Sequence, residues 1–129
     1  MVVLLGAVYF VFGVAFAAFA RWSASDSKHE TWNRLGFLAS AIAFALHIGY
    51  EQFRLRNSPL ITALHVSAAV ALGAFALAVR VNVNGLGMAA SNHGLRAFAL
   101  VAWPAITAVP AFVVALVAAA ALSLRRRSA

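Results

Sequence analysis

Long apolar stretches alternate with short polar segments along the whole chain. Four stretches, at residues 2–20, 35–53, 60–79 and 95–124, are mostly apolar, and crossing the hydrocarbon core of a bilayer takes about 20 such residues. The stretches are too long for strands, and their many alanines favour helix. The pattern predicts an all-α fold in which residues 1–129 form one domain, an antiparallel up-down four-helix transmembrane bundle.

Three more polar segments separate the predicted spans. A polar loop is expected over residues 21–34, a tight link over 54–58 and a loop of mixed character over 80–94. The shortness of the second link predicts that the second and third spans form an antiparallel hairpin. Pro104 and Pro110 lie inside the fourth span, and each removes a backbone hydrogen bond, so we expect a kink or tilt there.

The composition indicates a surface that faces lipid. Apolar residues make up 64% of the chain and charged residues 10%, whereas soluble domains carry about 25% charged residues. The net charge of +7 does not indicate nucleic-acid binding, because the basic residues lie singly or in short runs between the apolar stretches. Membrane proteins keep Lys and Arg at such positions, level with the lipid headgroups. We expect the lipid bilayer, and no nucleic acid, as a partner.

Several further features bear on location. The abundance of Ala, Val and Arg is typical of bacterial proteins from GC-rich genomes, and we expect a multi-pass protein of the bacterial inner membrane. The ten Lys and Arg residues divide evenly between the two predicted sides, so they do not fix the orientation. No basic residue precedes the first apolar stretch, which favours a retained span over a cleaved signal peptide. The absence of cysteine excludes thiolate catalysis, disulfides and iron–sulfur clusters.

The second predicted span carries the most informative polar residues. Ser40, Phe44, His47, Glu51 and Arg54 are spaced four, three, four and three residues apart, which places them on one face of a helix. The histidine and the glutamate are close enough in sequence to touch. Ionisable groups within a span are costly and usually face the interior of the bundle. This face is therefore predicted to point inward.

The third predicted span adds a second histidine. Thr62 and His65 share a face of that helix, and the short link places His65 and His47 roughly 10 Å inside the same membrane surface. Tyr50, Arg54 and Arg56 are then expected at the mouth of the site. The predicted ligand or proton site consists of His47, Glu51, His65, Ser40, Thr62, Tyr50 and Arg54.

Four interpretations of this cluster are open. The polar side chains could simply hold helices together through hydrogen bonds. A carboxylate beside a histidine could instead bind a proton or a ligand in a small transporter or channel. His47 and His65 could be the axial ligands of a b-type haem in an electron-transfer protein. Finally, the two histidines and Glu51 could bind a metal or act as acid and base in a small metal-dependent membrane enzyme, although the HExxH spacing is missing.

The preferred hypothesis is a small, non-enzymatic membrane protein. It would bind or move a small ligand or ion through the intramembrane polar site, or act as an accessory subunit of a membrane complex. A chain of this size with so many small residues is also expected to form a homo-oligomer or to join a larger complex. The b-type haem protein and the metal-dependent enzyme are the first and second alternatives.

The size, the four spans and the balanced charge resemble those of the small multidrug resistance exporters. The exporters carry their essential glutamate in the middle of the first helix. The first span of this chain contains no acidic residue, so the residue that carries the mechanism is missing and membership is not inferred.

Overall fold

The computed structural model describes residues 1–22, 26–84 and 93–127, and these residues are almost entirely helical. The elements are α1 (Val2–Trp22), α2 (Asp26–Gly49), the π-helix η1 (Tyr50–Arg54), α3 (Pro59–Asn84) and α4 (His93–Arg127). No strand occurs in these three described ranges. The all-α prediction is confirmed, and the predicted tight link is present between η1 and α3.

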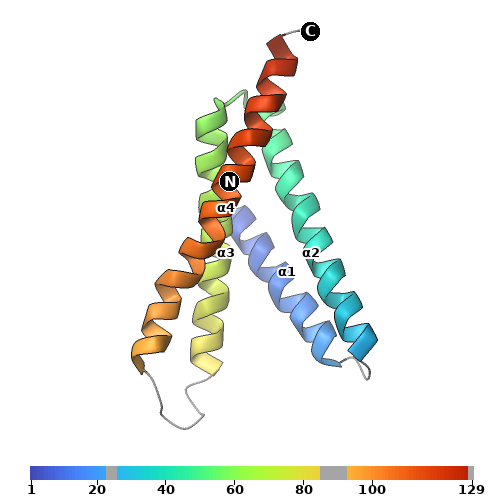
Figure 1. Ribbon diagram of the computed structural model, residues 1–129, viewed down its shortest axis with the longest axis vertical. Helices are drawn as coiled ribbons and strands as arrows, with labels where there is room; N and C mark the ends of the chain where they lie inside the picture. The colour runs from blue at the N-terminus through green and yellow to red at the C-terminus, as the bar shows by residue number, and fades with distance from the viewer. Residues whose placement is uncertain (23–25, 85–92, 128–129) are drawn as a thin grey trace.

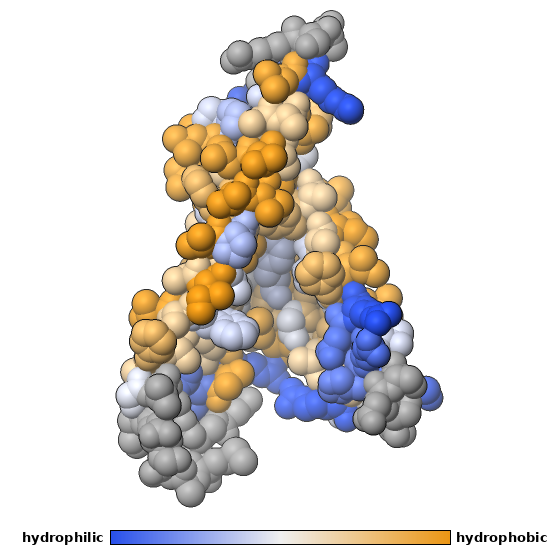
Figure 2. All heavy atoms as spheres, viewed as in Figure 1, coloured by the Kyte–Doolittle hydropathy of each residue, from blue (hydrophilic) through white to orange (hydrophobic). Residues whose placement is uncertain are grey.

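Three of these helices are long and apolar enough to cross a membrane, namely Val2–Trp22, Pro59–Val83 and Ala97–Arg125. Many large apolar side chains on them, such as Val3 and Val101, are exposed. Figure 2 shows apolar residues over most of the visible outer surface, with hydrophilic residues gathered toward the two ends. Such a surface is suited to lipid in its middle and to water at its ends.

The helix α2 does not meet the same criterion, and its start differs from the prediction. Residues 26–34 were expected in a polar loop, but they form the first turns of α2. Glu30 and Arg34 form an ion pair of 2.5 Å one turn apart, with both side chains exposed, and such i,i+4 pairs favour helix. The helix is thus polar at its start and apolar only from about residue 35.

The helix α3 also differs from the prediction, because it extends to Asn84 beyond the predicted end at residue 79. Residues 85–92 of the third predicted loop lie outside the described ranges.

The four helices form two hairpins that meet at one end (Figure 1). Consecutive helices run in opposite directions, with α1 beside α2 and α3 beside α4. The helix α3 packs against both α1 and α4, whereas α2 packs mainly against α1. Near the η1–α3 link the hairpins converge, and toward the other end they diverge, so the predicted antiparallel four-helix bundle is not confirmed. The fourth predicted span forms one helix, α4, which continues through both Pro104 and Pro110.

Small residues allow the close contacts at the converging end. Ile48 of α2 meets Ala63 and Val66 of α3 and Ala115 and Ala119 of α4 in one buried apolar cluster. Alanines in facing positions let helix backbones approach closely, and the resulting van der Waals packing favours helix association in lipid. This cluster, which we call the apolar plug, lies directly beside the polar residues described below.

Glycines bring α1 against α3. A Cβ atom at Gly6 would lie 2.9 Å from Cβ of Leu72, and a Cβ atom at Gly73 would lie 2.8 Å from Cβ of Tyr9 and 3.1 Å from the carbonyl oxygen of Gly6. Neither position has room for a side chain. The two glycines therefore let α1 and α3 approach closely.

Candidate functional site

Glu51 lies in a short π-helix at the converging end of the molecule. The turn is closed by a hydrogen bond from the Leu55 amide to the Tyr50 carbonyl, at 3.2 Å, which spans five residues instead of four. A regular α-helix turns by about 100° per residue, so the side chains of two consecutive residues point in different directions. In the wider turn both Glu51 and Gln52 point inward, with 0% and 2% of their surface exposed. Such π-turns are frequent at functional sites.

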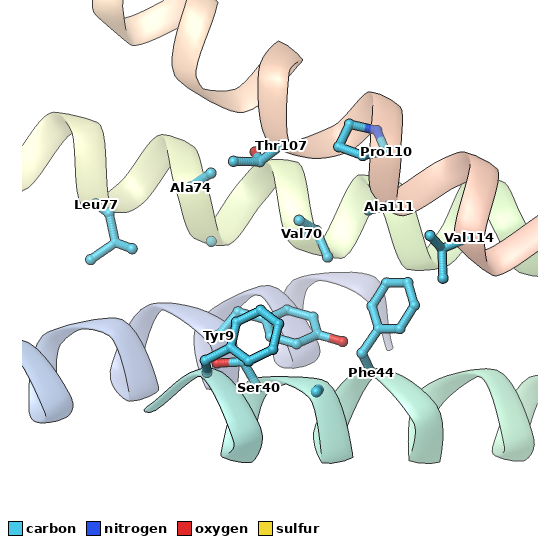
Figure 3. Close-up of a pocket in the computed structure, with 13 residues that line it drawn as sticks. Tyr9, Ser40, Phe44, Val70, Ala74, Leu77, Thr107, Pro110, Ala111 and Val114 are labelled. Carbon is cyan, nitrogen blue, oxygen red and sulfur yellow. The ribbon is translucent and has the colours of Figure 1, made fainter. Parts of the chain in front are cut away.

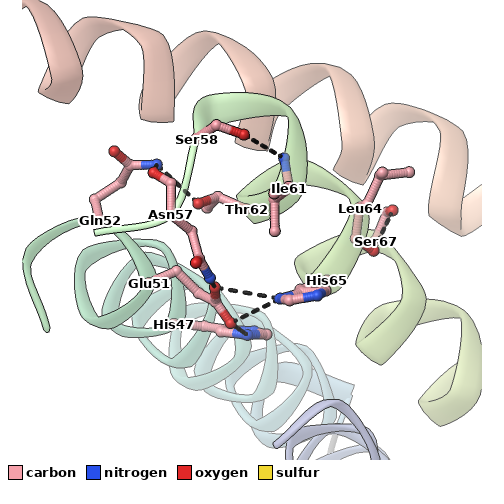
Figure 4. Close-up of polar contacts among 10 residues, drawn as sticks. All are labelled: His47, Glu51, Gln52, Asn57, Ser58, Ile61, Thr62, Leu64, His65 and Ser67. Carbon is pink, nitrogen blue, oxygen red and sulfur yellow. Dashed lines mark hydrogen bonds and ion pairs between the residues drawn. The ribbon is translucent and has the colours of Figure 1, made fainter. Parts of the chain in front are cut away.

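Two imidazoles approach the Glu51 carboxylate from different helices. Nδ1 of His65 on α3 lies 3.2 Å from Oε1 and 3.3 Å from Oε2 of Glu51, and Nε2 of His47 on α2 lies 3.7 Å from Oε1. Figure 4 shows both rings directed at the carboxylate. The His47 side chain is fully buried, whereas the His65 side chain is 43% exposed. The carboxylate thus connects a buried imidazole to one that reaches the surface.

The link after η1 completes the shell around Glu51. Arg56 has φ 55°, a left-handed conformation that costs a non-glycine residue about 1–2 kcal/mol. It turns the chain back so that the Asn57 amide donates to the Glu51 carbonyl at 3.1 Å, and the Asn57 side chain donates to Oε2 of Glu51. A strained residue next to a buried carboxylate indicates that the turn is held by these contacts.

Gln52 ties the π-helix to the start of α3. Its side-chain nitrogen donates to Oγ1 of the buried Thr62 at 2.7 Å and to the Asn57 carbonyl at 3.3 Å. Neither Gln52 nor Asn57 is among the residues predicted from the sequence. The signal for Gln52 is its place beside Glu51 near the end of an apolar stretch, where an amide group needs a partner. It falls off the predicted face, because that face assumes regular α-helix.

His47 has no hydrogen bond to any residue in the described ranges. Both ring nitrogens are buried and unpaired there, although Nε2 is near Glu51. The ring also lines a groove of about 670 Å³ between the start of α1 and the end of α2. Tyr50 and Arg54 line the same groove and are exposed. Of the predicted mouth residues, Tyr50 and Arg54 therefore share a groove with His47, whereas Arg56 does not line it.

Ser40 is not part of this polar cluster. It lines a cleft of about 410 Å³ between the two hairpins, together with Tyr9 of α1 and Thr107 of α4, as Figure 3 shows. The other lining residues are apolar or glycine, and the Tyr9 hydroxyl is buried without a hydrogen-bond partner among the described residues. Phe44 also lines the cleft and packs against the apolar plug. Along α2, Phe44 thus separates Ser40 from His47 and Glu51.

The arrangement favours proton or cation binding over the two cofactor alternatives. Within the described ranges no Lys or Arg side chain forms an ion pair with Glu51. The titratable side chains that contact its carboxylate there are those of His47 and His65. A bis-histidine haem needs two imidazole nitrogens on opposite sides of the porphyrin, but here both rings face the same carboxylate. In the part of the chain that the structure describes, no set of three or more His, Asp or Glu side chains is arranged to hold a metal ion.

No protein-family model matches the chain, and comparison with the curated proteins and with the solved structures found no match.

Proposed function

We propose that the protein is a non-enzymatic, multi-pass membrane protein that binds a proton at Glu51 and moves a small ligand or ion in step with that proton. The observation that carries the proposal is the Glu51 carboxylate, fully buried between the imidazoles of His47 and His65. In this proposal α2 and η1 form the fourth span. The lipid bilayer of the bacterial inner membrane is then the natural environment, and self-association or a larger membrane complex completes the assembly.

A proton is the cation that this cluster is best suited to hold. A charged carboxylate buried without a cation is strongly disfavoured, and no Lys or Arg is available to it in the described ranges. The negative charge can be neutralised by a proton on Glu51 itself or on a neighbouring imidazole. The His65 side chain is partly exposed, whereas those of Glu51 and His47 are fully buried. His65 therefore offers the path by which a proton reaches the carboxylate.

The cleft between the hairpins is the proposed place for the transported ligand. Its volume of about 410 Å³ lies in the range of small-molecule sites, about 300–1,000 Å³. The lining is apolar except for three hydroxyl groups, so the ligand would be mostly apolar with one or two hydrogen-bonding groups. Phe44 and the apolar plug separate this cleft from Glu51, and movement of Phe44 would connect the two.

The proton-binding step can be tested without knowing the ligand. Infrared difference spectra of the protein in liposomes, recorded as the pH is lowered, should show the carbonyl band of a buried protonated carboxyl group. Glu51→Gln should abolish this band, because it removes the fully buried Glu51 carboxylate. The matched control is Glu30→Gln, which removes an exposed carboxylate and should leave the band in place. A band that persists in Glu51→Gln would refute the assignment.

Movement of protons is tested in the same liposomes. With no ligand supplied, we expect an imposed membrane potential to drive a low level of uncoupled proton uptake above that of protein-free liposomes, reported by a pH-sensitive dye inside the vesicles. Uptake should fall to the level of protein-free liposomes in Glu51→Gln and stay at the original level in Glu30→Gln. Equal uptake by the original protein and Glu51→Gln would show that the cluster is a structural contact between helices.

A further inference from the structure

The groove between the start of α1 and the end of α2 has two kinds of wall. One is apolar, with Leu4 and Leu5 from α1 facing Leu46 and Phe53 from α2 and η1. The other is polar and consists of His47, Tyr50 and Arg54. We propose that this groove binds one anionic phospholipid, with its phosphate at Arg54 and an acyl chain along the leucines. This inference needs α2 to cross the membrane, as proposed above, but it does not depend on proton movement.

The charge of the groove selects an acidic head. Arg54 is exposed and forms no ion pair with any described residue. No acidic residue lines the groove, because Glu51 is fully buried and its carboxylate contacts His65 of α3. A guanidinium group matches the geometry of phosphate oxygens and binds them through paired hydrogen bonds. The groove therefore presents the unneutralised Arg54 cation to a headgroup.

His47 supplies the second recognition element. Its side chain is 0% exposed, its ring nitrogens have no hydrogen-bond partner among the described residues, and it forms part of the groove wall. Leaving a buried polar group without a partner costs about 1–3 kcal/mol, so the proposal has the ring turn toward the groove and donate a hydrogen bond to a ligand atom there. The ester carbonyls of a phospholipid lie between its phosphate and its acyl chains and fit this order.

The positions along the helix match the layers of a bilayer. Arg54 and Tyr50 are at the end of the span, where arginine and tyrosine meet the headgroups. His47 lies seven residues earlier than Arg54, roughly 10 Å deeper at 1.5 Å per residue, and Leu46 and Leu4 flank it. The head thus meets the cation near the membrane surface, and the ester and the start of the chain meet the imidazole and the leucines deeper in the membrane. The volume of about 670 Å³ is within the range of known ligand sites, about 300–1,000 Å³.

Native mass spectrometry of the detergent-purified protein tests this proposal. The protein is titrated with phosphatidylglycerol and, separately, with phosphatidylcholine of the same acyl chains. We expect one phosphatidylglycerol to bind in preference to phosphatidylcholine, and Arg54→Gln to weaken that binding about tenfold, as expected for loss of a charge-assisted hydrogen bond. The matched control is Arg56→Gln, because Arg56 is exposed but does not line the groove.

Two further variants make the result specific. Leu46→Trp fills the groove without changing charge and should also weaken phosphatidylglycerol binding. Glu51→Gln should keep the binding while losing the buried carboxyl band, so that failure of the lipid site and failure of the proton site are separate results. Equal affinity for the two lipids would show that the groove does not select an anionic head. Equal losses in Arg54→Gln and Arg56→Gln would show only general attraction of anionic lipid to a basic surface. Either result would overturn the proposal.

Discussion

Single residues in the polar cluster carry costs that their neighbours offset. A buried carboxylate is tolerated only when it is hydrogen-bonded or paired. Asn57 and His65 provide those contacts to Glu51, and the left-handed Arg56 positions Asn57. The same reasoning applies to Gln52, whose amide nitrogen is satisfied by Thr62 and by the Asn57 carbonyl. The residues of the link therefore stabilise the site as well as connecting two helices.

Thr62→Val tests the contact between η1 and α3. The substitution keeps the shape of the side chain but removes the hydroxyl that accepts a hydrogen bond from the buried Gln52. We expect the free energy of unfolding to fall by about 1 kcal/mol, the usual range for polar contacts between membrane helices. The measurement is unfolding in mixed detergent micelles followed by circular dichroism.

Thr107→Val is the matched control for that experiment. The Thr107 hydroxyl donates only to carbonyls of its own helix, those of Trp103 and Pro104, at 3.0 Å each. Its loss should therefore change the unfolding free energy much less than the loss of the Thr62 hydroxyl. Similar losses in the two variants would show that the Gln52–Thr62 bond does not connect the helices energetically.

At the scale of helices, the contact between α1 and α3 depends on glycine. Gly73 faces Gly6 and Tyr9 so closely that a methyl group has no space. Gly73→Ala should therefore push α1 away from α3 and lower the free energy of unfolding by about 1–3 kcal/mol, as overpacking usually does. The same micelle assay measures the change.

Gly49→Ala provides the comparison. A Cβ atom at Gly49 meets no atom within 4 Å, so only helix propensity changes, and the variant should be unchanged or more stable by up to about 1 kcal/mol. If Gly73→Ala were as stable as Gly49→Ala, the glycine contact would not hold α1 and α3 together.

The sequence predicted the helices better than it predicted their details. Hydropathy places the apolar stretches, because each must satisfy its backbone within a helix, and helical spacing brings His47 and Glu51 together. It does not reveal the π-turn, which depends on tertiary contacts such as Asn57 with Glu51. The predicted face therefore missed Gln52. It also grouped Ser40 with the site, although α2 diverges from α3 and places Ser40 in the cleft.

At the scale of the whole molecule, the path of the chain makes α2 a candidate for the fourth crossing. In Figure 1 the end of α1 and the start of α3 lie at opposite ends of the molecule, and α2 runs from one to the other. The helices α1, α3 and α4 have the length and apolarity of spans. If they lie across a bilayer as arranged here, α2 must traverse it too. Its polar first turns would then project into the headgroups, and His47 and Glu51 would lie on its inward face.

Cysteine labelling tests this arrangement directly, because the chain contains no cysteine of its own. Asn33→Cys lies near the polar start of α2 and Ser58→Cys lies in the link before α3. Both positions are exposed. A membrane-impermeant maleimide applied to sealed vesicles of one orientation should label only one of the two, and vesicles of the opposite orientation should reverse the result. Leu46→Cys, in the apolar part of α2, should react only after the membrane is dissolved. Labelling of positions 33 and 58 from the same side would place α2 outside the bilayer, and both the proton site and the lipid groove would then lose their membrane setting.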